Sequence, residues 1–539
     1  MNGDPNMTPT TASIVDAYTL VGSVTLRPES LGFEPLFEGM RKRGISRSAV
    51  ISLRALHADA RKGNADLFRV ARQDPRIIPV GVLGPQASTL ETEDLLEECL
   101  RNGASALTFP VTEGSLLSSL SFRKKIEKAA ATGLPLIACG VIHSGIPSTL
   151  AALTRDLHCP LLLAGTSYLL FDELLAVLEE HHHVYADCSW VPTPGAIELL
   201  LRYAGKERIL FSSGSTLRPI QPALNTVLDA EIEEQDKRRI LGSNALRFFG
   251  RPQEADQLQT AATSLPELRI PSTPAIDVHT HLGTIPGISA TIRDLKAIEH
   301  FSSRFKMEYS ICSSYVAYHE DLDAGNQEML DAIDGRARLL GSPVISPTHL
   351  DASICWLDRC SRDPKLPHAT LTMETVREET GDESYLRLFE AAAKRHVPIF
   401  LNGPSWDERR LLRWPRGPGY APFLRSATNA DLQMFLEIGR RHPDLPIILG
   451  HGLGKEGIEL ARQRPNFYLE LSGTYPDRGD VRRAIDAVGK EQVVFGTDLD
   501  LIVPAFALGI YYEADLSAEE DRLIMAENAR RILDLPGTV

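Results

Sequence analysis

The sequence predicts an α/β protein made of two tandem (β/α)8 barrels of the TIM type. Three observations lead to this prediction. Short apolar runs alternate with helix-like segments along the chain, and the order of these runs repeats in the second half. In addition, 539 residues are enough for two barrels of roughly 250 residues each.

Eight apolar runs, each followed by a small or polar turn, predict the strands of the first barrel. Continuous apolar runs are typical of a parallel sheet that is buried on both faces. Segments with apolar residues at three- and four-residue spacing, such as 91–100 and 122–131, lie between them and predict helices. The runs are 13–15, 49–53, 77–82, 106–109, 135–138, 160–163, 184–186 and 209–211.

The second half repeats six segments of the first half in the same order, which indicates an internal duplication. The matched pairs are 14–22 with 276–283, 135–140 with 398–403, 160–165 with 446–451, 184–189 with 467–472, 209–214 with 493–498, and 244–248 with 528–532. We therefore place a first barrel at 1–265 and a second at 274–539. The Pro-, Ser- and Thr-rich stretch 264–274 is the expected linker.

An insertion distinguishes the second half. The offset between matched segments rises from 263 at Pro135 and Pro398 to 286 at Pro160 and Pro446, so 23 residues are gained after the fifth strand. Loops that follow barrel strands open on the active face, so we expect a lid or a substrate contact here. A surface elaboration is the alternative. The inserted aromatic and basic residues are Trp406, Arg409, Arg410, Arg413, Trp414, Arg416 and Tyr420.

Composition excludes several classes of function. With 43% hydrophobic and 24% charged residues the chain is typical of globular proteins, and a net charge of −14 argues against nucleic acid as a partner. No apolar run could span a membrane, and the polar N-terminus lacks the core of a signal peptide. Seven cysteines without a CxxC pair do not make a disulfide framework. We expect a cytoplasmic protein with a small-molecule substrate and neither nucleic-acid nor membrane partner, and we leave association into a homo-oligomer open.

Residues that can carry chemistry lie in the second half. His279 and His281 lie on a short apolar strand, so both imidazoles point to one face and can bind one divalent metal. His451 follows the sixth strand and Asp498 follows the eighth. The matching positions of the first half hold Tyr18, Leu20, Gly165 and Gly214. This pattern indicates one working site and one degenerate copy without metal ligands.

Four motifs of the second half resemble the amidohydrolase superfamily. They are Asp-Val-His-Thr-His-Leu-Gly at 277–283, Ile-Ile-Leu-Gly-His-Gly-Leu-Gly at 447–454, Phe-Gly-Thr-Asp at 495–498 and Glu-Asn-Ala-Arg at 527–530. They are most similar to the amidohydrolase-related branch that includes aminocarboxymuconate-semialdehyde decarboxylase. The resemblance covers the whole second half and the skeleton of the first. It implies a (β/α)8 barrel with one divalent metal at its mouth.

The resemblance also implies roles. His279, His281 and Asp498 are the metal ligands, Asp498 is also a catalytic general base, and catalytic His451 orients water or polarises the substrate. We expect Zn²⁺ first and Mn²⁺ second. A metal-activated water beside a carboxylate suits hydrolysis of a C–N or C–O bond, which we place first. A metal-dependent non-oxidative decarboxylase of the same family and a non-catalytic pseudoenzyme are the alternatives.

One position departs from the family pattern, because Asn402 stands where the family usually has a fifth-strand histidine. Three outcomes are open: a metal held by three side chains, a harder ligand set that favours Mn²⁺ or Mg²⁺, or a lost metal site. Glu374 could supply a substitute oxygen, although a solvated loop acid is the simpler interpretation. The expected substrate contacts are Asn402, Trp406, Arg410 and Tyr315. Weaker pocket-lining candidates are Tyr318, His319 and His349.

Overall fold

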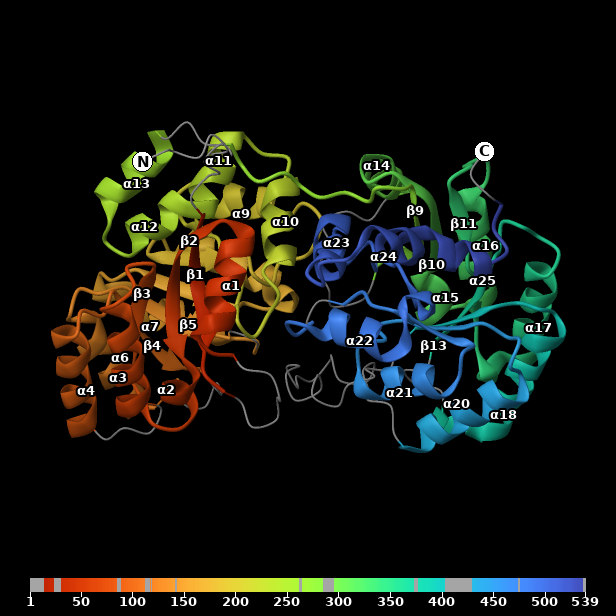
Figure 1. The fold of residues 1–539 in the computed structure, drawn as a ribbon, viewed down its shortest axis with the longest axis horizontal. Helices are drawn as coiled ribbons and strands as arrows, with labels where there is room; N and C mark the ends of the chain where they lie inside the picture. Colours follow the sequence, from red (N-terminus) through yellow and green to blue (C-terminus); the bar gives the residue numbers. More distant parts are fainter. Residues whose placement is uncertain are drawn as a thin grey trace, which may run out of the picture. The chain divides into compact units, whose positions relative to one another are not determined.

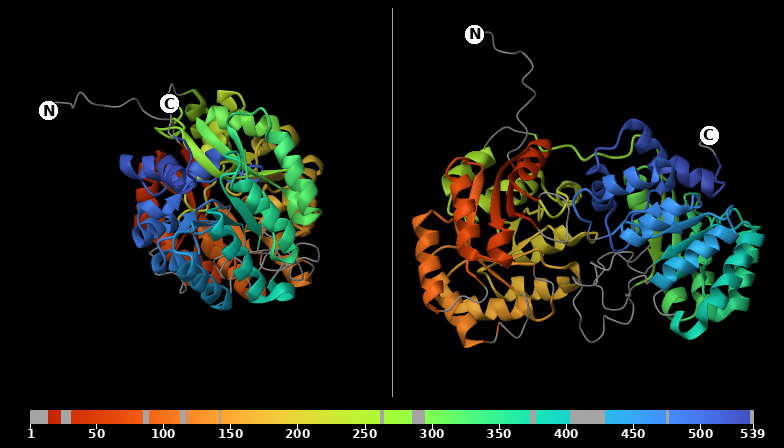
Figure 2. Two further views of the ribbon diagram at one scale, coloured as in Figure 1. Left: turned by 90° about the vertical axis from the view of Figure 1, so that its right-hand side faces the viewer. Right: turned by 60° about the horizontal axis from the view of Figure 1, so that its bottom comes forward.

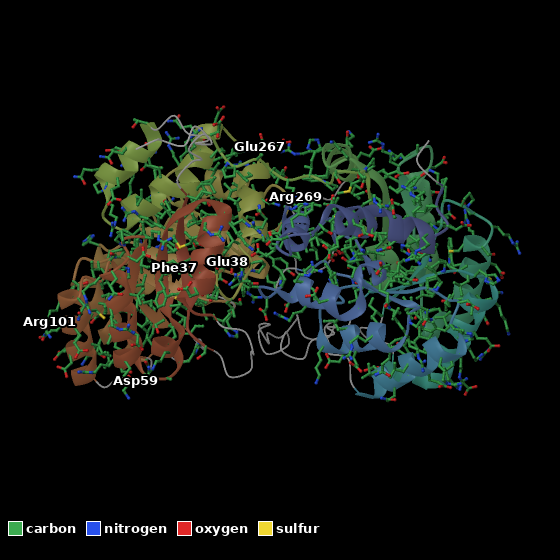
Figure 3. The ribbon with its side chains drawn as sticks, in the orientation of Figure 1. Phe37, Glu38, Asp59, Arg101, Glu267 and Arg269 are labelled. Carbon is green, nitrogen blue, oxygen red and sulfur yellow. The ribbon has the colours of Figure 1, made fainter. Side chains whose placement is uncertain are left out.

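A computed structural model of the chain forms two compact units, Met1–Leu268 and Arg269–Val539 (Figure 1). Figure 3 labels Glu267 and Arg269, which flank the boundary between them. The structure describes residues 14–23, 31–84, 89–111, 117, 119–140, 143–260, 264–284, 295–372, 377–402, 429–473 and 476–536.

The N-terminal unit contains a parallel eight-stranded sheet whose strands pair in chain order. Hydrogen bonds from Ala17 N to Phe211 O (2.9 Å) and from Gly214 N to Tyr18 O (3.0 Å) join the first strand to the segment after the last, which closes the barrel. The strands are β1 (Ile14–Val21), β2 (Ile45–Ser52), β3 (Ile77–Val82), β4 (Ala106–Pro110), β5 (Leu136–Cys139), β6 (Leu161–Ala164), β7 (Val184–Asp187) and β8 (Ile209–Leu210).

Helices surround these strands on the outside of the barrel (Figure 2). They are α1 (Phe33–Arg43), α2 (Leu53–His57), α3 (Ala60–Ala71), α4 (Thr89–Arg101), α6 (Leu120–Ala130), α7 (Ile146–Thr154), α8 (Phe171–Glu180), α9 (Ala196–Ala204), α10 (Gln221–Asp229), α11 (Glu234–Arg238), α12 (Asn244–Phe248) and α13 (Pro252–Thr260). Their apolar faces pack on the strands, and every residue of β1 is buried, as expected for a parallel sheet covered on both faces.

The C-terminal unit repeats this architecture with one interruption. Its third strand is split at Ser342 and Pro343, so that β11 pairs with β10 while β12 pairs with β13. Hydrogen bonds from His281 N to Leu499 O (2.9 Å) and from Asp498 N to His279 O (2.8 Å) close the ring. The strands are β9 (Ala275–Leu282), β10 (Met307–Ser314), β11 (Leu339–Gly341), β12 (Val344–Ile345), β13 (Ala369–Thr372), β14 (Ile399–Asn402), β15 (Ile447–Leu449), β16 (Phe467–Glu470) and β17 (Val493–Val494).

The helices of this unit again cover the outer face of the strands (Figure 2). They are α14 (Leu295–Arg304), α15 (Tyr315–His319), α16 (Leu322–Ile333), α17 (Leu350–Cys360), α18 (Arg377–Lys394), α20 (Asn429–Arg441), α21 (Lys455–Gln463), α22 (Asp480–Val488), α23 (Pro504–Tyr512), α24 (Ala518–Arg522) and α25 (Asn528–Ile532). No described helix combines the length and apolar character that crossing a membrane requires.

The two barrels repeat individual hydrogen bonds as well as strand order. In the first, Asn64 bonds both the N–H and the carbonyl of Val82, at 3.0 and 2.9 Å. In the second, Asn326 bonds Val344 in the same way, at 2.7 and 2.9 Å. Asp59, labelled in Figure 3, caps α3. The predicted fold class, two tandem (β/α)8 barrels arising from a duplication, is confirmed.

Candidate metal centre

The end of β9 forms the first part of the site. His279 and His281 are buried, and their Nε2 atoms lie 2.9 Å apart. Adjacent residues of a strand point to opposite faces, so Thr280 between them points away and donates to the carbonyl of Ile311 at 2.8 Å. The His-x-His pattern therefore brings two imidazole nitrogens to one point, as the sequence predicts.

Two further strands bring His451 and Asp498 to the same point, since His451 follows β15 and Asp498 follows β17. Asp498 Oδ1 lies 3.5 Å from His279 Nε2 and 3.3 Å from His281 Nε2. Its Oδ2 lies 3.9 Å from His451 Nε2. The candidate ligand atoms of His279, His451 and Asp498 all lie within 4.8 Å of one another. His451 is therefore placed to bind a metal as well as to act in catalysis.

The other nitrogen of each β9 imidazole has its own partner. Glu470, at the end of β16, lies 3.0 Å from His279 Nδ1, and Ser313 Oγ lies 2.8 Å from His281 Nδ1. Although burial opposes ionisation, the hydrogen bond and charge of His279 lower the pKa of Glu470, so this carboxylate accepts from His279. Ser313 can direct its own hydrogen to the carbonyl of Thr280, 3.5 Å away, and accept from His281.

Both Nε2 atoms are then acceptors that face each other across 2.9 Å. Two lone pairs this close repel one another unless a cation neutralises them, either a proton on one ring or a metal ion bound to both. Asp498 adds a carboxylate and His451 adds another imidazole, which makes a donor set that Zn²⁺ and Mn²⁺ accept. The residues present therefore fit the divalent ion that the sequence predicts.

Burial makes the charges of the site act strongly on one another. It lowers the pKa of His281 to about 4 and also lowers the pKa of His451. Burial disfavours the charged form of His279 as well, but Asp498 and Glu470 outweigh it and raise the pKa of this histidine. Burial of Asp498 is likewise outweighed, chiefly by His279 and His281, and its pKa is lowered. Two ionised carboxylates thus favour positive charge at the centre.

His451 and Asp498 hold a backbone conformation that residues with side chains avoid. Their φ angles are +57° and +61°, in the left-handed region that costs an L-residue about 1–2 kcal/mol. The matching residues of the N-terminal barrel are Gly165 and Gly214, at +64° and +68°. The C-terminal barrel therefore keeps two side chains where glycine would be unstrained, which is typical of functional sites.

Asn402, at the end of β14, borders the centre. Its side-chain nitrogen lies 3.4 Å from His281 Nε2 and 3.1 Å from the hydroxyl of Tyr318. The two ends of an amide are assigned from the hydrogen-bond network, and rotating this amide would put its oxygen beside His281. This position suits either an oxygen ligand or a substrate contact.

Aromatic rings line one side of the centre. The ring of Tyr315 stacks on that of His281, with 4.6 Å between centroids and 25° between planes. His319 also stacks on Tyr315, at 6.1 Å. Tyr315 therefore lies beside the centre, and its role as a substrate contact stays a prediction. His349 is exposed and contacts Thr348.

Several other predicted contacts lie outside the described residues. They are Glu374 and the residues of the insertion, Trp406, Arg409, Arg410, Arg413, Trp414, Arg416 and Tyr420. Their expected roles stay predictions.

Glu470 is the partner that sequence reasoning missed. A Cβ on Gly496 would lie 2.7 Å from Glu470 Cγ, so the glutamate needs a glycine at that position. In the N-terminal barrel the matching residues are Asp187 and Ser212, and the shorter acid accepts from Gly165 N at 3.1 Å. The two positions therefore differ together between the barrels. Aligning the two halves of the sequence could have identified Glu470 by this paired difference.

The amidohydrolase family model matches the chain twice, at residues 25–251 and 276–535. The two matches span most of the chain, so the protein belongs to the amidohydrolase family and carries its domain in two copies. No curated protein matches the chain.

Solved structures match about half of the chain. One is 2,6-dihydroxybenzoate decarboxylase from Rhizobium, with 18% identity over 49% of this chain and 100% of that chain, at a TM-score of 0.40. Another is 5-carboxyvanillate decarboxylase from Sphingomonas paucimobilis, with 16% identity over 49% of this chain and 100% of that chain, at a TM-score of 0.40. A third is a dihydroxybenzoic acid decarboxylase from Polaromonas sp. JS666 with bound manganese. It has 16% identity over 49% of this chain and 97% of that chain, at a TM-score of 0.38.

Shortening Glu470 is expected to weaken metal binding. In Glu470→Asp the carboxylate no longer reaches His279, and loss of such a partner lowers metal affinity by about 10–100-fold. Titration with Zn²⁺ or Mn²⁺ against a competing chelator measures this. The double variant Glu470→Asp with Gly496→Ser, which copies the Asp187–Ser212 pair, is the control for packing. Wild-type affinity in both variants would contradict the role of Glu470.

The stability of variants that lack the His451 side chain is expected to depend on the residue that replaces it. Because φ is positive there, His451→Gly should be more stable than His451→Ala by about 1 kcal/mol. Denaturant unfolding of the metal-free proteins measures the difference. An alanine variant as stable as the glycine variant would show that the backbone at this position is unstrained.

Proposed function

We propose that the C-terminal barrel is a divalent-metal-dependent enzyme that removes a carboxyl group from a small organic acid. The observation that carries the metal-dependent part is the convergence of His279, His281, His451 and Asp498 on one point at the carboxyl ends of three strands, β9, β15 and β17. Barrel enzymes keep their chemistry at this end of the strands.

The ligands would be His279, His281 and Asp498, with His451 as the further nitrogen donor and Asn402 at the edge. The nitrogen donors suit Zn²⁺, and the oxygens of Asp498 and Asn402 suit Mn²⁺. When bound, such an ion supplies a Lewis acid that polarises a carboxylate or carbonyl oxygen.

An open coordination position leaves room for a substrate on the proposed ion. Three or four protein ligands would leave at least one position of a divalent ion for water or substrate. The carboxylates of Asp498 and Glu470 together match the charge of such an ion, so charge balance does not choose between the two reactions. A substrate carboxylate would take the open position in decarboxylation, whereas water would take it in hydrolysis.

Exclusion of water favours decarboxylation. The side chains of His279, His281 and Asp498 are 1%, 2% and 8% exposed. Loss of CO2 spreads the charge of a carboxylate, so it is favoured where the carboxylate is stripped of water. The C–C bond breaks, its electron pair stays on the substrate carbon, CO2 departs and that carbon takes a proton. Asp498 and His451 are the acid–base pair placed to hold this proton.

Hydrolysis is the second candidate, supported by His451. Its side chain is 22% exposed, which leaves one side of the centre open to water. In that reaction the same acid–base pair takes a proton from the attacking water and passes it to the leaving group.

The test is CO2 release by the full-length protein with 2,6-dihydroxybenzoate and 5-carboxyvanillate, the acids named for the decarboxylases above. We expect turnover that is lost on metal removal, restored by Mn²⁺ or Zn²⁺, and lowered about 10²–10⁴-fold by Asp498→Asn. His349→Ala, which changes an exposed histidine of the same barrel, is the matched control. Turnover of esters or amides but of no acid would favour hydrolysis, and turnover that survives metal removal would contradict both candidates.

A further inference from the structure

Two residues beside the metal centre differ together from their counterparts in the N-terminal barrel. Tyr315 begins α15 where Leu53 begins α2, and Asp500 follows the eighth strand where the first half has Thr216. The C-terminal barrel therefore has a phenol and a carboxyl where the N-terminal barrel has neither, at two positions that are distant in the sequence.

Tyr315 and Asp500 are in contact. The hydroxyl of Tyr315 donates to Asp500 Oδ1 at 3.2 Å, and the ring of Tyr315 stacks on the His281 imidazole. Asp500 is 6% exposed, and burial, followed by the charge of Asp498, raises the pKa of its carboxyl well above the ordinary value. A divalent cation at the centre would favour the ionised form, in which both oxygens are acceptors. The pair thus borders the metal centre.

One oxygen of this carboxyl has no role inside the fold. Asp500 Oδ2 is buried, and no described residue gives it a hydrogen bond. The counterpart Thr216 differs, because its hydroxyl reaches the carbonyls of Leu20 and Leu31, both at 2.9 Å. A buried acceptor without a donor costs about 1–3 kcal/mol, and at Asp500 this cost falls beside the metal centre, where a ligand can supply the donor.

We propose that Asp500 Oδ2 accepts a hydrogen bond from a hydroxyl or amino group of the substrate. Resting on the proposed function, this assigns the substrate to a class, small acids that carry such a donor in addition to the carboxylate directed to the metal. Tyr315 acts as a positioning residue, because it fixes Oδ1 and leaves Oδ2 for the ligand. A site built around a donor rejects analogues that lack it, since its own acceptor is then left unpaired.

The test uses matched ligands that differ only in the donor. The Mn²⁺-loaded full chain is titrated calorimetrically with 2-, 3- and 4-hydroxybenzoate and with their methyl ethers. Wild type should bind at least one hydroxy acid about tenfold more tightly than its ether, which corresponds to one unpaired acceptor. The preference should vanish in Asp500→Thr, the residue of the other barrel. It should vanish or reverse in Asp500→Asn, whose amide can present a donor.

Asp521→Asn is the matched control, because Asp521 is also buried in this barrel with one oxygen, Oδ1, that no described residue bonds. It should keep the wild-type preference. Metal content and unfolding temperature are measured for every variant, and the Asp500 variants should keep their metal.

Three results would overturn the inference while leaving the proposed function intact. They are equal binding of hydroxy acids and ethers by wild type, a preference that survives in both Asp500 variants, and loss of the metal in those variants, which would make Asp500 a ligand. Failure of the metal-loaded protein to bind any of the acids would overturn the proposed function and this inference together.

Discussion

Two imidazole nitrogens held 2.9 Å apart, each with its other nitrogen bonded elsewhere, are the constraint on which the C-terminal barrel's site depends. The strand alternation of β9 brings His279 and His281 together, and Glu470 and Ser313 fix which nitrogen of each ring faces the centre. Once both rings present lone pairs to the same point, only a cation makes the arrangement favourable. Asp498 and His451 add a carboxylate and a third imidazole to the same point. Both residues hold a strained backbone conformation there, with positive φ.

The N-terminal barrel shows what the fold needs without this constraint. It keeps the skeleton, including the Asn64 bonds to Val82 that Asn326 repeats on Val344. At the sixth and eighth strand ends it has glycines with the same positive φ, and its seventh strand carries the shorter Asp187 beside Ser212. Features shared by the two barrels therefore serve folding. Features confined to the second barrel, such as Glu470 with Gly496 and Tyr315 with Asp500, are the ones that we assign to the proposed metal site and reaction.

Much of the fold follows from the sequence, because continuous apolar strands and a repeat with constant order leave few alternatives to two parallel barrels. The convergence of His279, His281, His451 and Asp498 also follows, since the carboxyl ends of barrel strands meet at one mouth. The partners of these groups do not follow. Glu470 reaches His279 only because Gly496 leaves room for its side chain. Asp500 meets Tyr315 past the intervening strand β9, and this contact depends on side-chain lengths that strand patterns do not encode. Whether Asn402 can act as an oxygen ligand depends on which end of its side-chain amide faces His281.

The central claim, that this barrel holds a divalent metal, is tested most directly by elemental mass spectrometry of the purified protein and of the double variant His279→Ala with His281→Ala. We expect about one Zn²⁺ or Mn²⁺ per wild-type chain, as in mononuclear catalytic sites, and none in the double variant. A wild-type protein that binds no ion even when Zn²⁺ and Mn²⁺ are supplied would contradict the account. The facing imidazoles would then be neutralised by a proton alone.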